Sequence, residues 1–454
     1  MTVPGGTRDP RGRIAPQSTP GVPSDPRLRA RIVRVTAIPA VSPPARDSRL
    51  FLPDRLVAYG AVVLVSFFGV VSYGQFQPGA RDGAFGDALN YIRMSEQTFA
   101  PVDDPFALRL LTPWLAQQGA RVSGLHPDIV WLTLTFVATV AAVLVTYELM
   151  RGPLSVGPQT SLFAALLLSV TFHYASYNYG NFWLVDPLNN LVFALAIYFA
   201  FRGMLVPFVA VLIIGSVNKE TALLLAPLFP LLAWARTGRV RDRAVVLGVA
   251  GAAGVAAVYL AFRAWAGGQV GPNGVHLDAS PAELARVVLA SRHGQEHLAV
   301  YGVFHFLWIV FAYSLYRRYQ RRGVRDGLLL ASAYVLGCAL LGRLQATDTE
   351  RVFVMVAPLL VAGVAVLVDG WEAGTARPWV WVLGIVYAAL SLRWVTGDLA
   401  VLLNIGALAG FVLLLQQAGR ARTRSRGGGG ADYPGLPATD VGPTVAVTDP
   451  SRRV

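Results

Sequence analysis

The chain carries a succession of apolar stretches long enough to cross a lipid bilayer, separated by short polar segments. A helix needs about 20 mostly apolar residues for one crossing, and by that measure there are about twelve candidates. Charged residues make up only 14% of the chain, against about 25% in soluble proteins. Such a chain cannot cover a globular surface with polar groups, so its solvent over most of its area is lipid. The sequence predicts an all-α, polytopic transmembrane helical bundle with about 10–12 spans.

The apolar stretches also divide the chain. They lie at residues 56–76, 128–149, 159–177, 187–202, 204–217, 221–235, 244–266, 300–316, 327–342, 352–369, 379–395 and 398–417. Three are short, and the pair flanking residues 218–220 could be two half-length helices rather than two full spans. Residues 1–50, rich in Pro and Arg, and residues 419–454, basic and then Gly-rich, predict disordered cytoplasmic tails on a membrane domain of residues 51–418.

Arginine placement predicts the orientation. Loops on the cytoplasmic side of membrane proteins are enriched in Lys and Arg. With the N-terminus inside, every dense arginine group falls on the cytoplasmic side, including residues 236–243, residues 317–325 and the C-terminal cluster. The net charge of +13 is thus explained by topology, and no nucleic acid partner is expected. Both termini are then cytoplasmic, and the outer segments are 77–127, 178–186, 218–220, 267–299 and 343–351.

The first outer segment is only half polar. Between Phe106 and Leu115 the apolar residues recur at helical spacing, with Arg109 and Gln117 on other faces, and Trp114 suits the membrane interface. This predicts an amphipathic helix on the outer surface, with a second short one near Asp87–Arg93. The competing interpretation is an ordinary hydrophilic loop.

Further unexpected polar residues stand at the outer ends of later apolar stretches. Asp186 precedes Pro187 and could simply cap the following helix. Lys219 and Glu220 divide two apolar stretches; neighbours on a helix do not face each other, so their partners should come from other helices, such as Asp87, Asp186 or Asp348. The alternative is a tight outer turn.

Arg351 lies on the side where arginine is disfavoured. Its planar guanidinium suits a carboxylate or a phosphate partner. Together with Asp348 it could instead belong to a surface salt-bridge cluster of little energetic consequence.

These features together resemble the GT-C class of integral membrane glycosyltransferases. The resemblance covers roughly residues 55–415 and rests on Gly86-Asp87-Ala88-Leu89-Asn90-Tyr91, Pro105 to Pro113, Asn218-Lys219-Glu220-Thr221, and Asp348-Thr349-Glu350-Arg351 with Pro358. Members of the class use a polyprenyl-phosphate-linked sugar as donor and carry an essential acidic residue in the first outer loop. Many relatives have two adjacent acidic residues there. Here Ala88 follows Asp87, and the pair Asp103-Asp104 comes later, so these two are alternatives for the acid.

The resemblance implies a set of roles. A base must take the acceptor's proton, and cations must stabilise the departing phosphate. Asp87 is the expected base, with Asp103 or Asp104 as alternatives or as ligands of a possible divalent cation, Mg or Mn; no cofactor is certain and metal ligands are unknown. Arg109, Lys219 and Arg351 are expected to bind phosphate. Glu220, Asp186 and Asp348 are expected to orient the sugar or these cations.

The resemblance also implies a setting. The enzyme would sit in a bacterial plasma membrane, facing outward, and would transfer the sugar to a glycan, lipid or protein acceptor of the cell envelope. Two other functions remain open. One is a transporter or flippase for a lipid-linked or anionic solute, since broken helices with buried charges are typical of transporters. The other is an enzyme resembling O-antigen polymerases or ligases, which would transfer a whole chain.

Overall fold

The computed structural model describes residues 52–74, 87–100, 102, 106–270, 296–343, 349–371 and 377–427. The chain divides into residues 1–53 and a compact unit of residues 54–454, and the helical core belongs to the second. The described part is helical, without a strand, which confirms the all-α class. The expected tails, except the part of the C-terminal tail that belongs to the last helix, lie outside the described residues, as do residues 271–295 of the expected outer segment 267–299.

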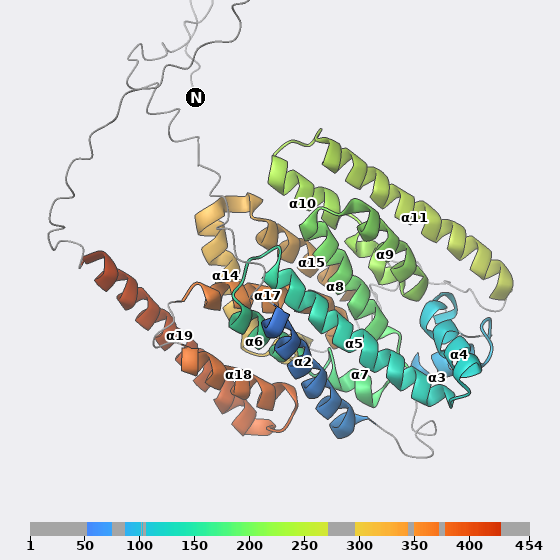
Figure 1. The fold of residues 1–454 in the computed structure, drawn as a ribbon, viewed down its shortest axis with the longest axis horizontal. Helices are drawn as coiled ribbons and strands as arrows, with labels where there is room; N and C mark the ends of the chain where they lie inside the picture. The colour runs from blue at the N-terminus through green and yellow to red at the C-terminus, as the bar shows by residue number, and fades with distance from the viewer. Residues whose placement is uncertain are drawn as a thin grey trace, which may run out of the picture. The chain divides into compact units, whose positions relative to one another are not determined.

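The helices vary widely in length, and short 3-10 helices lie between several of them (Figure 1). They are α2 (Leu52–Tyr73), α3 (Asp87–Glu96), the 3-10 helix η3 (Phe106–Leu108), α4 (Leu111–Ser123), α5 (Pro127–Arg151), α6 (Pro158–Ser169), α7 (Ser176–Gly180), α8 (Asp186–Arg202), α9 (Leu205–Asn218), η4 (Glu220–Leu225), α10 (Leu228–Thr237), α11 (Arg243–Val270), α13 (Glu296–Phe304), α14 (Leu307–Arg322), η5 (Gly323–Arg325), α15 (Gly327–Arg343), α16 (Thr349–Phe353), η6 (Val354–Val356), α17 (Ala357–Asp369), α18 (Arg377–Ser391) and α19 (Gly397–Gly427).

Several of these helices can cross a membrane. Five are long and apolar enough, and a sixth crossing results if α13 and α14, bent by 79° at residues 305–306, count as one. Three shorter apolar helices, α9, α15 and most of α18, add to them. Among the described residues, fewer helices are long enough to span a membrane than the sequence has apolar stretches, because turns break several of these stretches into shorter helices.

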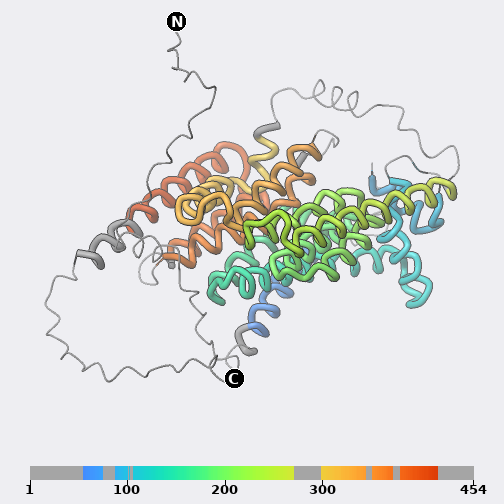
Figure 2. Tube along the Cα trace, turned by 90° about the horizontal axis from the view of Figure 1, so that it is seen from above, coloured from blue at the N-terminus to red at the C-terminus, as the bar shows by residue number. Residues whose placement is uncertain are grey.

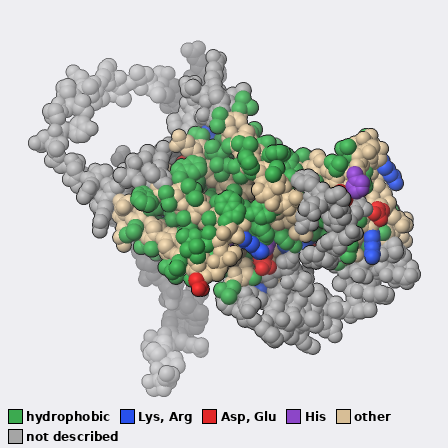
Figure 3. Space-filling model, turned by 90° about the horizontal axis from the view of Figure 1, so that it is seen from below, with side chains coloured by type: hydrophobic (Ala, Val, Ile, Leu, Met, Phe, Trp, Pro, Cys, Tyr) green, Lys and Arg blue, Asp and Glu red, His purple; other side chains and the backbone are tan. Residues whose placement is uncertain are grey.

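The helices differ in how much surface they bury. In the stretch Glu350–Asp369, which ends in α17, 72% of the apolar segment is buried inside the protein. In α19 the buried share is 17%. Large apolar side chains such as Phe67 on α2, Leu260 on α11 and Leu402 on α19 are exposed. Hydrophobic side chains spread over much of the described surface in Figure 3. An apolar exterior of this kind fits a bundle surrounded by lipid.

The helices α8, α9, α10 and α11 lie alongside one another, as the green tubes in Figure 2 show. α9 begins next to the end of α8, and Arg236 near the end of α10 donates to the carbonyl of Ala200 near that same end. α9 and α10 therefore form an antiparallel hairpin, with residues 219–227 at its turn. The 14 residues of α9 reach only about 21 Å, against about 30 Å of bilayer core. The turn that carries Lys219 and Glu220 is thus recessed into the bundle.

The first outer segment has a small core of its own. α3, η3 and α4 pack on the beginning of α5 and on residues 182–185 through buried aromatic side chains, among them Tyr91, Trp131 and Trp183. The helix expected over 106–115 is interrupted: η3 ends at Leu108, and α4 begins at Leu111. Trp114 is exposed, as an interfacial position requires.

Candidate functional site

Arg351, on α16, connects two carboxylates. Its Nη1 donates to Asp87 at 2.8 Å, and its Nε donates to Asp186 at 2.8 Å, with Nη2 on the same Asp186 oxygen. Asp87 opens α3 and Asp186 opens α8. A planar guanidinium is suited to such two-sided contact because its N–H groups point in fixed, diverging directions. Segments distant in the sequence are thereby held at one point.

Lys219 joins the same group from the turn between α9 and η4. Its Nζ donates to Asp186 at 2.6 Å, so Asp186 receives a cation on each oxygen. The side chains of Lys219 and Asp186 are 15% and 12% exposed, which leaves little water to screen the pair. Burial lowers the pKa of Lys219 below its ordinary value, and the attraction of Asp186 opposes this shift only in part.

Glu220 faces the opposite way and binds Arg109. Lys219 has an extended backbone, with φ −159° and ψ 130°, and successive side chains of extended backbone point to opposite sides. Arg109 Nε donates to Glu220 at 3.0 Å, and Arg109 Nη1 donates to the Tyr91 hydroxyl at 2.9 Å. Burial raises the pKa of Glu220, but the Arg109 pair outweighs it, so the pKa of Glu220 lies below its usual range.

The turn itself is held by an amide. Asn218, fully buried, donates to the carbonyl of Val185 at 3.0 Å and accepts from the Thr112 hydroxyl. It thereby joins the end of α9 to the beginning of α8 and to α4. Buried polar groups are stabilising only when they are hydrogen-bonded, and this one fixes the position of the neighbouring Lys219.

We call Asp87, Arg109, Asp186, Lys219, Glu220 and Arg351 the ionic site. It combines three acids and three bases, mostly buried, at one end of the bundle. Residues 236–243 run from the end of α10 to the beginning of α11, and residues 317–325 run from the second half of α14 through η5. Arg325 stacks on Trp234, and Arg236 donates to the carbonyl of Ala200, so both arginine groups lie near the end of α8, whose beginning carries Asp186. The asymmetry of the sequence is therefore present in the fold.

Most of the candidate residues are brought together, and three are not described. Asp87, Arg109, Asp186, Lys219, Glu220 and Arg351 meet in the ionic site, whereas Asp103, Asp104 and Asp348 lie outside the described residues. Lys219 and Glu220 indeed find partners on other elements.

Two local expectations were wrong. Asp186 does not cap α8, because its carboxylate binds Lys219 and Arg351 instead. Arg109 and Gln117 do not lie on other faces of one amphipathic helix: Arg109 falls between η3 and α4 and pairs with Glu220, and Gln117, on α4, is buried and donates to the carbonyl of Glu96 at 3.0 Å. Apolar spacing cannot show that a polar side chain has a buried partner.

The sequence analysis assigned no role to three further contributors to the site. Tyr91, on α3, receives the hydrogen bond of Arg109, and Asn218 holds the turn. Tyr259, on α11, is buried and within electrostatic reach of Glu220 and Arg109. An isolated tyrosine in an apolar stretch carries no signal that distinguishes it from a packing residue.

The described residues do not fit a divalent cation. No group of three or more His, Cys, Asp or Glu among them could hold a metal ion. The carboxylates of Asp87, Asp186 and Glu220 are instead directed at arginine and lysine. The expected cation therefore remains a prediction that concerns Asp103 and Asp104.

Of three comparisons with known proteins, only the one with solved structures finds similar chains. No protein-family model and no curated protein matches the chain. Among solved structures, the chain is similar to the crystal structure of ArnT from Cupriavidus metallidurans bound to undecaprenyl phosphate, with 16% identity, a TM-score of 0.45, and coverage of 82% of this chain and 78% of that chain. It is also similar to apo ArnT from the same organism, with 16% identity, a TM-score of 0.43, and coverage of 80% and 74%.

Proposed function

We propose that the protein is a membrane glycosyltransferase of the GT-C class. It moves a sugar from a polyprenyl-phosphate donor to a cell-envelope glycan, lipid or protein acceptor, on the side of a bacterial plasma membrane away from the cytoplasm. The observation that carries this proposal is the geometry around Arg351, which holds a partly exposed carboxylate, Asp87, beside a recessed pair of cations, Arg351 and Lys219.

The arrangement separates the two tasks of glycosyl transfer. The acceptor hydroxyl attacks the anomeric carbon of the sugar and gives its proton to a base. Asp87 suits this role because its side chain is 31% exposed, whereas that of Asp186 is 12% exposed and already binds two cations. A carboxylate that an acceptor can reach is required for proton transfer.

The cations stabilise the negative charge that develops on the departing phosphate. The bond between the anomeric carbon and the phosphate oxygen breaks, and its electrons pass to that oxygen. Arg351 and Lys219, held by Asp186, can donate to this oxygen without reorganising, which is the most effective form of electrostatic stabilisation. Arg109, held by Glu220 and Tyr91, is the third phosphate-binding cation of the proposal. The direct displacement inverts the anomeric configuration.

The recessed turn fits a lipid-linked donor. A polyprenyl phosphate presents its phosphate at the membrane interface while its tail stays in hydrocarbon. Lys219 lies at the end of a helix about 21 Å long, below the level at which a full-length span would end. A phosphate can therefore reach it from the lipid phase.

Two experiments test the proposal. Mass spectrometry of lipid-linked sugars in cells lacking the protein should show an accumulated polyprenyl-phosphate sugar, which disappears when the gene is restored. In proteoliposomes, the Asp87→Asn variant should lose transfer of that sugar, and Asp398→Asn, which changes an exposed acid at the beginning of α19, should retain it.

The proposal fails if Asp87→Asn leaves transfer intact. It also fails if the reconstituted protein accumulates solute in vesicles without forming a glycosylated product, which would establish a transporter.

A further inference from the structure

Each cation of the ionic site already binds a carboxylate, and the site contains as many acids as bases. A donor phosphate is a further anion. It competes with these carboxylates for the N–H groups of arginine and lysine, because phosphate and carboxylate suit the same guanidinium geometry. The carboxylate that yields to the phosphate determines how the site changes when the donor binds.

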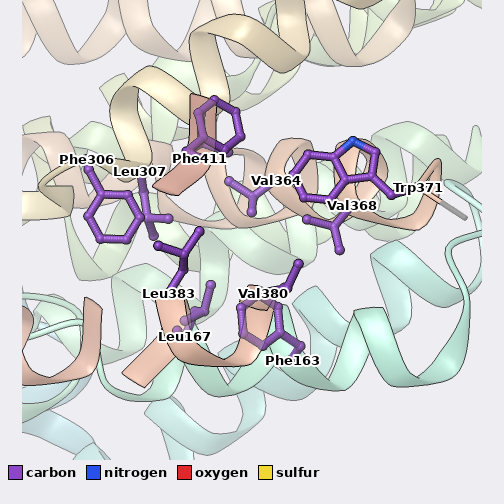
Figure 4. Close-up of a pocket in the computed structure, with 12 residues that line it drawn as sticks. Phe163, Leu167, Phe306, Leu307, Val364, Val368, Trp371, Val380, Leu383 and Phe411 are labelled. Atoms are coloured by element: carbon purple, nitrogen blue, oxygen red, sulfur yellow. The ribbon is translucent and has the colours of Figure 1, made fainter. Parts of the chain in front are cut away.

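An apolar cavity elsewhere in the bundle cannot take the donor. It lies between α6, α14, α17, α18 and α19 (Figure 4). Its volume is about 30 Å³, which is too small for a sugar ring or a prenyl chain. Its lining side chains, among them Phe306, Val364 and Trp371, include no cation. The donor phosphate is therefore assigned to the cations of the ionic site.

The contact of Asp186 with Arg351 resists displacement. Nε and Nη2 of Arg351 both donate to one oxygen of Asp186, and Lys219 donates to the other oxygen. The side chains of Arg351 and Asp186 are each 12% exposed, so little water is present to replace a lost partner. A buried charge that loses its partner is strongly destabilising. Asp186 therefore keeps the guanidinium of Arg351 in place.

The contact of Glu220 with Arg109 resists displacement for a different reason. Nε and Nη2 of Arg109 donate to the two oxygens of Glu220, which is the paired geometry in which arginine binds a carboxylate most strongly. Nη1 of Arg109 donates to Tyr91. A guanidinium has five N–H groups, so Arg109 can meet a phosphate without giving up Glu220.

The contact of Asp87 with Arg351 is the most easily exchanged of the three. It consists of a single hydrogen bond of 2.8 Å from Nη1. The Asp87 side chain is 31% exposed, so water can solvate the carboxylate once it is released. Asp87 is also the first residue of α3, where the helix dipole stabilises a negative charge. Loss of its cation therefore costs Asp87 less than it would cost Asp186.

Lys219 lies across the Asp186 carboxylate from Arg351 and can bind the same phosphate. An ammonium group has three N–H donors, and among the described residues Asp186 receives one of them. Asp186 holds both cations, one on each oxygen. A phosphate that receives a hydrogen bond from Arg351 thus gains a second cation without displacing Asp186.

We propose that the donor phosphate takes the Nη1 hydrogen bond of Arg351 from Asp87 and thereby releases Asp87 as the base. The guanidinium stays where Asp186 holds it, and one hydrogen bond passes from a carboxylate oxygen to a phosphate oxygen. Before the donor binds, Asp87 is tied to Arg351 and withheld from the hydroxyl of the sugar acceptor. This inference rests on the transferase function proposed above and adds an order to it, with the donor binding before the acceptor.

Chemical labelling of carboxylates tests the exchange. The full-length protein in detergent micelles is treated with a water-soluble carbodiimide and a glycine ester, which together amidate accessible carboxylates. Peptide mass spectrometry then measures the labelling of Asp87. The probe is polyprenyl phosphate, which has the phosphate and the tail but no sugar. It should raise the labelling of Asp87 roughly tenfold, as the loss of one charge-assisted hydrogen bond predicts. Native mass spectrometry of the same samples measures whether the lipid is bound.

Matched controls isolate the role of the phosphate. Polyprenol, which lacks the phosphate, should leave the labelling of Asp87 unchanged. Asp398, an exposed acid at the beginning of α19, should be labelled equally with and without the lipid. In Arg351→Gln the labelling of Asp87 should be high before any lipid is added. Arg121→Gln, which changes an exposed arginine of α4, should respond as the wild type does.

Three results would overturn the proposal. If polyprenyl phosphate binds and the labelling of wild-type Asp87 stays the same or falls, the phosphate does not displace Asp87, although the transferase function stands. If polyprenol raises the labelling equally, the tail rather than the anion releases Asp87. If polyprenyl phosphate does not bind, the proposed class of donor is wrong, and the exchange is wrong with it.

Discussion

The coupling between Arg351 and Asp186 is the most direct test of the ionic site. Both side chains are 12% exposed. Removing one partner of a buried pair typically costs about 3–5 kcal/mol, because the other charge is left uncompensated. In Arg351→Gln, Asp186 keeps Lys219, so the cost should fall at or just below the lower limit of this range, at about 2–3 kcal/mol.

The double variant separates the pair from its surroundings. Asp186→Asn removes the charge that Arg351 and Lys219 share, and in Arg351→Gln, Asp186→Asn neither partner is left charged. A double-mutant cycle, which compares the wild type, the two single variants and the double variant, should give a coupling energy of about 1–3 kcal/mol between Arg351 and Asp186. Equilibrium unfolding of the purified protein in mixed detergent micelles measures all four forms.

Additive effects would refute this reasoning. If the two single losses of unfolding free energy sum to that of the double variant within about 0.5 kcal/mol, the contact contributes nothing as a pair. Arg121→Gln, an exposed arginine of α4, serves as a control and should change the unfolding free energy by less than about 0.5 kcal/mol.

Two further substitutions have defined outcomes. Arg109→Lys keeps the charge but loses the two-atom contact with Glu220, so transferase kcat should fall by about 10²-fold in steady-state assays; an unchanged kcat would remove Arg109 from phosphate binding. Gly363→Ala places a Cβ 2.6 Å from Phe311 and should lower the unfolding free energy by about 1–3 kcal/mol. Gly406→Ala, with open space around it, should not lower it, and equal losses in both would contradict the packing argument.

Much of the fold could be predicted because lipid imposes a simple rule. A membrane helix must be apolar for most of its length, so the positions of α5, α11 and α19 follow from hydropathy alone. The short hairpin of α9 and α10 could not be settled in this way. Its direction depends on the contact between Arg236 and Ala200, which hydropathy does not show.

The candidate site was predictable to the extent that its residues violate that rule. Lys219, Glu220 and Arg351 are charged where apolar residues are expected, so each attracts attention singly. Their pairing was less accessible, since Asp186 had an equally good local role as a helix cap.

The bond between Arg351 and Asp87 spans 264 residues of sequence, and this separation matters for how the protein is made. Chains enter the membrane from the N-terminus onward. Until α16 arrives, Asp87, Asp186 and Glu220 face only Arg109 and Lys219, so the half-built site carries one excess negative charge. The last cation both balances that charge and ties the first outer segment to the final third of the chain. The site is therefore complete only after most of the bundle has been made, with α17, α18 and α19 still to follow. A chain ending before residue 349 would lack the arginine that pairs with Asp87 and would leave Asp186 with Lys219 alone.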